Sequence, residues 1–247
     1  MRTNDNTVLI TGGSAGIGLA IAKRLVAAGN TVIVCGRDES RLEQARAVVP
    51  GLHAIRCDLS RDDELPGLRD RITRDFPGLN VLINNAAMMR IYDFCESPGV
   101  PEQIEAEVRT NLLAPMKLTS LLLPLLQAKE QAAIVIVSSG LAYVPVSNVT
   151  VYCATKAALH SFAQSLRARL RCTPINVFEL LPPLVDTDLT RTLRMPKLQP
   201  DDVARALLHG LVRDQYEIRV GMVKSLYVAS KLMPSLAQRL LNTAFSR

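Results

Sequence analysis

A tyrosine and a lysine four residues apart, Tyr152 and Lys156, are the pair in this sequence with the clearest chemical use. They lie at the start of a segment with helical periodicity, where a spacing of four places both side chains on one face. A free phenol has a pKa of ~10, too high for proton exchange at neutral pH, but a nearby ammonium favours the phenolate. Such a pair could pass a proton to or from an alcohol oxygen while a hydride moves at carbon.

The same spacing arises by accident on amphipathic helices, so its meaning depends on other polar residues in the chain. Ser139 ends an apolar strand-like run, NNAA at 84–87 ends an earlier one, and Asn111 follows in a helical segment. Each could be a turn or capping residue by itself. Together, in this order, they predict a catalytic set of Asn111, Ser139, Tyr152 and Lys156, with the Ser139 hydroxyl bonded to a substrate carbonyl.

A glycine-rich turn, TGGSAGIG at 11–18, joins the first strand-like segment to the first helical one. Phosphate binding at a helix start needs exposed backbone N–H groups and no side chain in the way. Glycine at 12, 16 and 18 would permit the turn, the approach of a pyrophosphate and helix–strand packing. Such a turn can merely end a strand, but its place between a first strand and a first helix favours a dinucleotide site.

Strand-like and helix-like segments alternate along the chain. The expected strands are 7–11, 31–36, 52–57, 81–84, 133–138, 175–181 and 217–220. The expected helices are 17–28, 40–48, 64–75, 101–113, 115–127, 152–170 and 201–213, followed by an amphipathic tail helix at 223–241 that is interrupted at Pro234. Apolar strands separated by helices indicate a parallel sheet covered on both faces. We therefore predict the α/β class: one doubly wound Rossmann domain over 1–247, with a seven-stranded parallel sheet flanked by helices.

Composition limits the function classes. The net charge is +6, but the basic residues are scattered and aromatic residues make up only 4%, which argues against nucleic-acid binding. Five separated cysteines without a Cys/His cluster suggest neither a metal site nor a disulfide framework. The odd cysteine count and the absence of a signal-peptide pattern lead us to expect a cytoplasmic protein. No apolar run reaches transmembrane length.

These motifs resemble those of the classical short-chain dehydrogenases/reductases over essentially the whole chain. The matches are TGxxxGxG at 11–18, Asp58-Leu59, NNAA at 84–87, Asn111, Ser139, YxxxK at 152–156 and PPLVDT at 182–187. Segments 138–145, 151–162 and 181–189 further resemble the subgroup named for the DltE-type oxidoreductase. The resemblance implies an enzyme that moves a hydride between a nicotinamide cofactor and a ketone or secondary alcohol.

The resemblance also implies a role for each matched position. Tyr152 would be the general acid/base, Lys156 would hold the nicotinamide ribose and lower the pKa of Tyr152, and Asn111 would sustain a water-linked proton path. Asp58 would contact the adenine and Thr187 the carboxamide. The expected cofactor contacts are Gly12, Ser14, Gly16, Ile17, Gly18, Arg37, Asp58, Leu59, Asn85, Ala86, Tyr152, Lys156, Val185 and Thr187.

Two positions depart from the family pattern. Ala87 replaces the glycine of NNAG and must then adopt backbone angles that glycine takes freely. Pro183 replaces the glycine of PGxVxT at the entrance to an irregular segment, 183–200, that follows the sixth strand. Ligands bind beyond the carboxyl ends of such strands, so this segment is expected to form a lid over the substrate.

The end of the second strand predicts a preference for NADP(H), with NAD(H) possible. An NAD-specific protein usually carries an acidic residue there, whereas this chain has Gly36 followed by Arg37. The Arg37 guanidinium can offer two donors to a 2′-phosphate. It could instead be a solvated turn residue that Asp38 neutralises.

Three functions remain open at this point, and the first is preferred. They are a ketoreductase acting on a small molecule, a nucleotide-binding regulator without chemistry, and a reductase of carrier-bound 3-oxoacyl groups. The last would need a basic patch at the lid mouth, for which Arg191, Arg194 and Lys197 are candidates. A homodimer or homotetramer is expected through the helices that begin near 112 and 152. The tail helix could pack on its own domain or join that interface, in preference to contact with a membrane surface.

Overall fold

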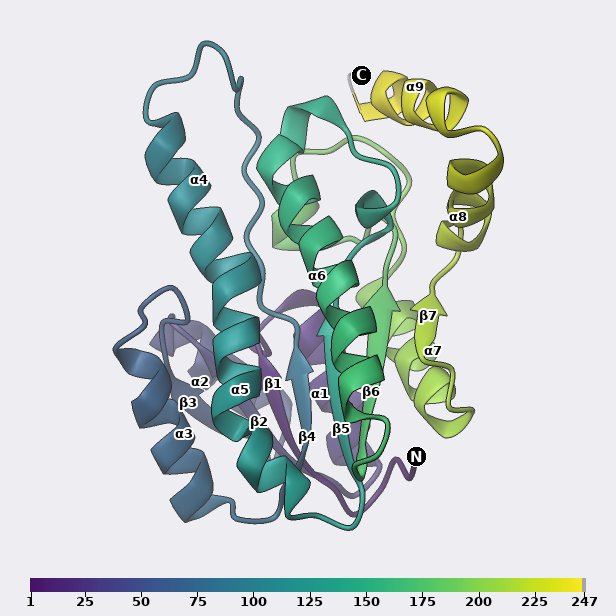
Figure 1. Ribbon diagram of the computed structural model, residues 1–247. Helices are drawn as coiled ribbons and strands as arrows, with labels where there is room; N and C mark the ends of the chain where they lie inside the picture. Colours follow the sequence, from purple (N-terminus) through teal and green to yellow (C-terminus); the bar gives the residue numbers. More distant parts are fainter. Residues whose placement is uncertain (246–247) are drawn as a thin grey trace.

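The computed structural model describes residues 1–245, in which one sheet of seven parallel strands lies between two layers of helices (Figure 1). The strands are β1 (Thr7–Thr11), β2 (Thr31–Gly36), β3 (His53–Arg56), β4 (Leu79–Asn84), β5 (Ala132–Val137), β6 (Ile175–Leu181) and β7 (Glu217–Arg219). Their order across the sheet is β3-β2-β1-β4-β5-β6-β7. The direction of winding reverses between β1 and β4, and doubly wound sheets bind ligands at that point. The predicted Rossmann fold is confirmed.

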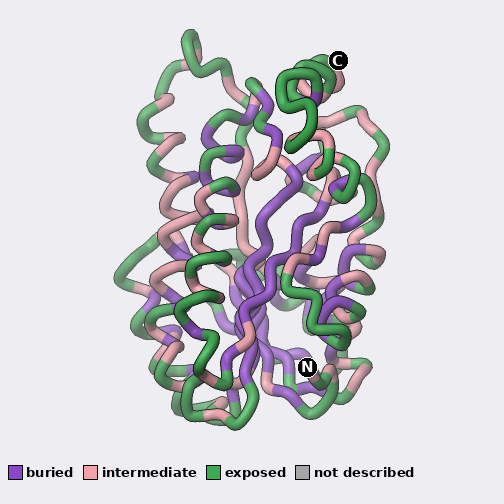
Figure 2. Tube along the Cα trace, turned by 45° about the vertical axis from the view of Figure 1, so that its right-hand side comes forward, coloured by how far each residue is buried: buried purple, intermediate pink, exposed green. Residues whose placement is uncertain are grey.

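Helices cover both faces of the sheet. On one face pack α1 (Gly16–Ala27), α2 (Glu39–Val48) and α7 (Pro200–Val212); on the other pack α3 (Glu64–Asp75), α5 (Ala114–Gln127) and α6 (Thr150–Leu170). The central strands are buried on both faces (Figure 2), and every residue of β5 is buried. Burial on both faces explains why these strands are continuous apolar runs in the sequence.

The chain between β4 and β5 differs from the predicted pair of helices at 101–113 and 115–127. Helix α4 (Val100–Val108) and α5 are joined by a π-helical turn, η1 (Arg109–Leu113), which carries Asn111. A π-turn widens the helix by one residue and is frequent at functional sites. It therefore turns the Asn111 side chain to a direction that a regular helix would not give.

The carboxyl ends of the strands open onto the upper edge of the sheet in Figure 1. Short 3-10 turns, η2 (Gly140–Ala142) and η3 (Ser147–Val149), lead from β5 to α6, and η4 (Asp188–Thr190) lies within the segment after β6. Helices α8 (Val223–Leu232) and α9 (Pro234–Phe245) lie above β7 at this edge, opposite α4. Within residues 1–245, no helix has the length and hydropathy that crossing a membrane requires.

Candidate active site

The turn between β1 and α1 requires glycine for reasons of backbone geometry. Gly12 and Gly16 have φ of 62° and 52°, in the left-handed region that favours glycine. At Gly18 a Cβ atom would lie 2.4 Å from the carbonyl oxygen of Gly12 and 2.6 Å from Nδ2 of Asn85. The N-terminus of α1 is thus left open to a phosphate, with its backbone N–H groups exposed.

Residues at the end of β4 hold this turn in place. The Asn85 amide donates to the carbonyl oxygens of Thr11 at 2.9 Å and Gly12 at 3.1 Å, while the Thr11 hydroxyl accepts from the backbone nitrogens of Asn85 and Ala86. Asn85 borders the cleft described below, but its side chain is used to anchor the turn. The expectation that Ala87 needs a glycine conformation is wrong. Within residues 1–245, positive φ outside glycine occurs at Asp5 and Asp214, so the chain leaves β4 with angles that Ala87 adopts without strain.

A cleft of about 450 Å³ runs along the carboxyl ends of β1, β2, β4 and β5. Twelve of the predicted cofactor residues line it, namely Gly12, Ser14, Gly16, Ile17, Arg37, Asp58, Leu59, Asn85, Ala86, Tyr152, Lys156 and Thr187. Gly18 lies beneath the turn instead, and Val185 is buried with its backbone paired to Leu198. An open glycine turn in the middle, cations at one end and a tyrosine–lysine pair at the other fit an elongated dinucleotide.

The end of the cleft beside β2 carries more positive charge than the sequence predicts. Arg41, in the first turns of α2, lines the cleft with Arg37, and its Nη1 lies 3.0 Å from Asp188 of η4. It therefore links α2 to the segment after β6 across the mouth of the cleft. Its position in the first turn of the helix predicted directly after Arg37 was a signal that could have identified it.

Asp58 lines the cleft near this positive end. Burial opposes its ionisation, but hydrogen bonds from the Ser60 hydroxyl and backbone nitrogen, together with Arg37 and Arg56, hold the pKa of the carboxyl below its ordinary value. An ionised Asp58 carries no proton, so its carboxylate can act only as an acceptor, for example of a hydrogen bond from an adenine amino group.

Tyr152, Lys156 and Ser139 meet at the carboxyl end of β5. Tyr152 and Lys156 are 8% and 2% exposed, and the Lys156 Nζ lies 5.5 Å from the centroid of the Tyr152 ring. The Lys156 ammonium donates to the carbonyl oxygen of Val137 at 2.8 Å. Ser139 accepts from the backbone nitrogen of Leu141 at 3.1 Å and is hydrogen-bonded to Tyr152. The three side chains that the sequence predicts as catalytic are therefore neighbours at the site.

Asn111 reaches this group from the π-turn but is fully buried. Its amide oxygen accepts from the backbone nitrogen of Met88 at 2.8 Å, and its Nδ2 donates to the Met88 carbonyl at 2.8 Å and to Thr155 at 3.3 Å. The side chain thus clamps the chain leaving β4 against α6. Thr155, between the tyrosine and the lysine, is a partner that the sequence gave no reason to single out.

The chain matches the family model described as short chain dehydrogenase over residues 6–197. It belongs to the short-chain dehydrogenase family. It is 41% identical over 237 residues to an uncharacterized oxidoreductase, DltE, of Bacillus subtilis, covering 94% of each chain. This agrees with the subgroup resemblance found in the sequence.

Two solved short-chain dehydrogenase structures extend the likeness. A Sphingobium yanoikuyae short-chain dehydrogenase in complex with NADPH is 26% identical, with a TM-score of 0.81 and coverage of 96% of this chain and 95% of that one. A bulky-bulky ketone specific alcohol dehydrogenase from Comamonas testosteroni is 28% identical, with a TM-score of 0.76 and coverage of 86% and 85%. Other structures with this fold hold NADP or NAD. The chain is an NAD(P)-dependent oxidoreductase, as the sequence predicts.

In this short-chain dehydrogenase, burial controls the protonation of the candidate catalytic residues. Burial raises the pKa of Tyr152, and the hydrogen bond with Ser139 opposes that rise. Burial also lowers the pKa of Lys156 to about 8, against the influence of Glu179. Desolvation of the phenol is the largest of the effects on the pKa of Tyr152. A raised pKa favours the protonated phenol, the form that can donate a proton.

Apolar side chains pack around Tyr152. Val146, Val149 and Cys153 are buried against the tyrosine, and partly buried apolar residues from four other parts of the chain complete the group: Ala87, Met89, Leu141, Leu189, Leu241 and Phe245. Cys153, next to the tyrosine in the sequence, is a packing residue here. Leu241 and Phe245 belong to α9, so the tail of this short-chain dehydrogenase packs against the group around Tyr152, which sequence periodicity did not show.

The two aspartates of the segment after β6 do not form a carboxylate pair. Asp186 lies 3.7 Å from the Lys197 ammonium, whereas Asp188 pairs with Arg41. Thr187 is the N-cap of η4. The segment after β6 is thus joined to α2 by the Asp188–Arg41 ion pair and is held internally by the Asp186–Lys197 ion pair. Thr187, between the two aspartates, lines the cofactor cleft.

Proposed function

We propose that this protein is an NADPH-dependent ketoreductase whose substrate carries apolar groups on its carbonyl carbon. The observation that carries the proposal is the cluster of apolar side chains packed around Tyr152, of which Ala87 and Leu189 also line the cofactor cleft. The apolar substituents of a ketone bound beside Tyr152 would contact these side chains. The likeness to the Comamonas enzyme for bulky ketones supports the same substrate class.

The residues have distinct tasks in this reaction. When bound, the nicotinamide supplies the hydride. Tyr152 donates its phenolic proton to the carbonyl oxygen, and the Ser139 hydroxyl donates a hydrogen bond to the same oxygen and orients it. The Lys156 ammonium stabilises the phenolate that Tyr152 becomes, and Asn111 keeps the chain after β4 in place beside the reacting groups.

Purified protein tests this function directly through NADPH consumption with a panel of ketones. The panel should contain aryl and branched aliphatic ketones, a small polar ketone, and a 3-oxoacyl thioester of coenzyme A, with the Tyr152→Phe variant as the blank. We expect turnover with the apolar ketones and little with the polar one. NADPH binding without turnover of any ketone above the blank would instead indicate a non-catalytic nucleotide-binding regulator.

The geometry does not favour a reductase of carrier-bound substrates. Of the three basic residues considered for carrier binding, Lys197 is engaged with Asp186 and its side chain is only 14% exposed. Arg191 and Arg194 are exposed, but two arginines on a surface segment are ordinary. Selective turnover of the thioester in the panel would reverse this choice.

We propose that NADPH is preferred over NADH through Arg37. The residue follows Gly36 at the end of β2, lines the cleft and carries an exposed guanidinium. A hydrogen bond to a charged group contributes roughly 1.5–3 kcal/mol, so Arg37→Ala should weaken NADPH binding by about one to two orders of magnitude. NADH binding, which involves no 2′-phosphate, should barely change.

Titration of both cofactors into the parent and the variant measures this difference. Arg205→Ala is a suitable control, because Arg205 is an exposed arginine of α7 paired with Asp202, outside the cleft lining. Equal affinity of the parent protein for the two cofactors would contradict the assignment. Retained preference in Arg37→Ala would transfer the role to Arg41.

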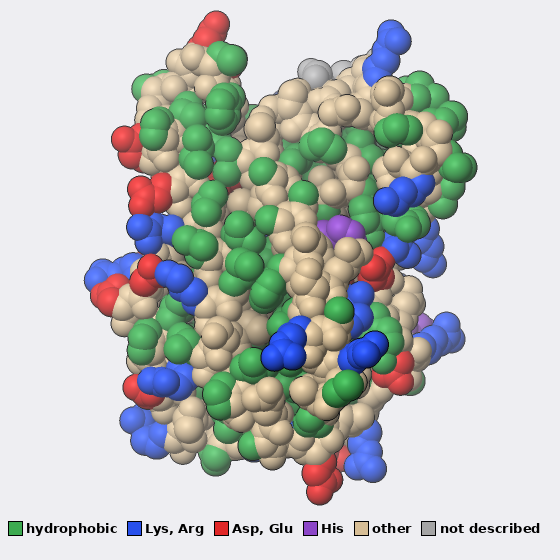
Figure 3. All heavy atoms as spheres, in the orientation of Figure 1, with side chains coloured by type: hydrophobic (Ala, Val, Ile, Leu, Met, Phe, Trp, Pro, Cys, Tyr) green, Lys and Arg blue, Asp and Glu red, His purple; other side chains and the backbone are tan. Residues whose placement is uncertain are grey.

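We also propose that the protein works as a homo-oligomer that pairs α5 and α6 between subunits. The outward side of α6 exposes a row of small residues, Ala154, Ala157 and Ser161, and hydrophobic side chains gather over these two helices (Figure 3). Small side chains allow helices of two subunits to approach closely. Sedimentation at micromolar concentration should show a species at least twice the 27.0 kDa of the chain, and a purely monomeric species would disprove the proposal.

A cytoplasmic location is the accompanying proposal. All five cysteines are free thiols, and three of them, Cys35, Cys57 and Cys153, are buried. Burial raises the pKa of these three thiols, which keeps them unreactive. Free, unpaired thiols suit a reducing compartment.

A further inference from the structure

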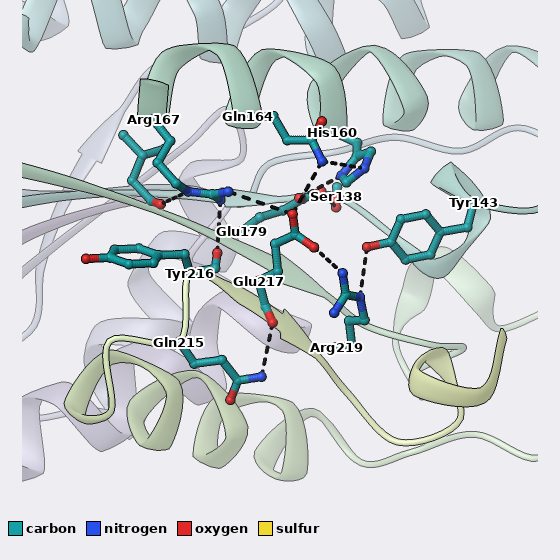
Figure 4. Close-up of polar contacts among 11 residues, drawn as sticks. Ser138, Tyr143, His160, Gln164, Arg167, Glu179, Gln215, Tyr216, Glu217 and Arg219 are labelled. Carbon is teal, nitrogen blue, oxygen red and sulfur yellow. Dashed lines mark hydrogen bonds and ion pairs between the residues drawn. The ribbon is translucent and has the colours of Figure 1, made fainter. Parts of the chain in front are cut away.

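The sheet-facing side of α6 continues beyond the catalytic pair. Tyr152, Lys156, His160 and Gln164 follow one another at intervals of four, and the stripe passes from buried residues to an exposed one. The proposed reaction uses the first two residues only. The third, His160, points to a carboxylate on the neighbouring strand, Glu179 (Figure 4).

Glu179 is a fully buried carboxylate in the middle of β6. Val177 and Leu181, two residues to either side on the same face of the strand, are buried and apolar. Burying a carboxylate without partners is costly, so its retention needs a reason. One carboxylate oxygen accepts from the Ser138 hydroxyl, and the other lies 2.8 Å from Nδ1 of His160.

The hydrogen bonds around His160 define which proton it carries. The Gln164 amide nitrogen lies 3.2 Å from Nε2 of His160 and 3.3 Å from a carboxylate oxygen of Glu217, so it donates to both. Nε2 is then the acceptor, and Nδ1 carries the proton that is donated to Glu179. A neutral imidazole and a serine hydroxyl thus both donate to Glu179.

The negative charge of Glu179 lies next to the site of Lys156. Ser138, which binds Glu179, directly follows Val137, whose carbonyl oxygen accepts from the Lys156 ammonium at 2.8 Å. Both partners of the carboxylate are thus close to Lys156 along the chain. Ser138 follows the residue whose carbonyl binds the lysine, and His160 lies one turn after the lysine on α6. Burial works against the ammonium, and Glu179 is the charge that works for it.

We propose that Glu179 is the buried counter-charge that keeps Lys156 protonated at the cofactor cleft, and that Ser138 and His160 hold Glu179 in position. Glu179 is thus a positioning residue for the reaction proposed above, since it acts through Lys156 and does not line the cleft. Only the effect of Glu179 on catalysis rests on the proposed ketoreductase function. The charge relation itself is a property of the protein without cofactor.

The other charged groups around Glu179 are engaged elsewhere. On β7, Glu217 is paired with Arg219, and Arg167 of α6 lies 3.8 Å from Glu217 (Figure 4). Arg219 donates to the Tyr143 hydroxyl at 3.1 Å and stacks 3.9 Å from the centroid of Tyr227.

The hydrogen bond with Glu179 raises the pKa of His160, so at acidic pH a charged imidazole would offset the carboxylate. The influence of Glu179 on Lys156 should therefore be strongest at alkaline pH, where the imidazole is neutral.

Unfolding in the absence of cofactor measures the relation. Because burial lowers the pKa of folded Lys156 to about 8 from 10.5, the lysine makes the stability of the parent rise with pH between those values. The difference in unfolding free energy between the parent and Lys156→Met isolates this rise. The same difference is then measured between Glu179→Gln and the double variant Glu179→Gln/Lys156→Met. In that pair the rise should begin about one pH unit lower than in the first pair.

Glu179→Asp is the matched control, since it keeps the charge and changes only the packing. It should leave the onset near that of the parent, whereas a purely structural role of Glu179 would make Asp and Gln behave alike. An onset unchanged in Glu179→Gln would overturn the proposal.

His160→Asn keeps the test decisive if Glu179→Gln does not fold. Asparagine can still donate to Glu179 but carries no titratable charge, so the onset should stay at or above the parent value. A fall like that expected for Gln would contradict the proposal.

NADPH binding provides the functional readout. The loss of affinity at alkaline pH should likewise begin about one pH unit earlier in Glu179→Gln than in the parent. If the pH dependence of unfolding shifts in Glu179→Gln but neither the parent nor any variant turns over a ketone, the proposed function is rejected and the charge relation between Glu179 and Lys156 still holds.

Discussion

Replacing Tyr152 by phenylalanine is expected to lower ketone turnover by about 10²–10⁴-fold, the usual contribution of a positioned acid/base. The ring is 8% exposed and packs against Val146, Val149 and Cys153, and phenylalanine keeps those contacts. The change removes only the phenolic oxygen and its hydrogen bond with Ser139. Cofactor affinity should therefore remain close to that of the parent.

Single-turnover and steady-state rates with saturating NADPH measure the effect, together with a cofactor titration. Tyr216→Phe is the matched control, because Tyr216 is 41% exposed, stacks on Phe178 and lies outside the cofactor cleft. It should retain parental turnover. A Tyr152→Phe enzyme that works at nearly parental rate would show that another group delivers the proton.

Gly18→Ala is expected to weaken NADPH binding by more than about 100-fold. The added Cβ would lie 2.4 Å from the Gly12 carbonyl oxygen and 2.9 Å from the Gly13 Cα, both in the backbone of the turn. The same Cβ would lie 2.6 Å from the Asn85 amide nitrogen that anchors Thr11 and Gly12. The turn would have to shift, and its N–H groups would no longer converge on a pyrophosphate.

Gly67→Ala separates this effect from the general effect of adding a methyl group to a helical glycine. Gly67 lies within α3, and a Cβ there would meet nothing within 4 Å. Alanine should raise the unfolding free energy by about 0.5–1 kcal/mol through helix propensity and leave NADPH binding intact. Calorimetric titration and urea unfolding of both variants provide the measurements. Parental NADPH affinity in Gly18→Ala would refute the role assigned to the turn.

The amino-acid sequence by itself was enough for the fold, the family and the chemical type of the site. Buried parallel strands leave unbroken apolar runs, and a phosphate-binding turn leaves glycines at fixed spacing, because both features depend on local geometry. Tyr152 and Lys156 could be paired for the same reason, since a spacing of four on a helix determines that they share a face.

Tertiary structure decided the features that depend on packing between distant segments. The π-turn at Asn111, the link from Arg41 to Asp188 and the contact of Phe245 with the Tyr152 cluster each join parts of the chain that no periodicity connects. The protonation of Tyr152 is the clearest case. Its lysine neighbour could be read from the sequence, but the desolvation that raises the pKa of the phenol is produced only when the fold closes around it. Glu179 likewise acquires its partners, Ser138 and His160, only when β5, β6 and α6 pack together.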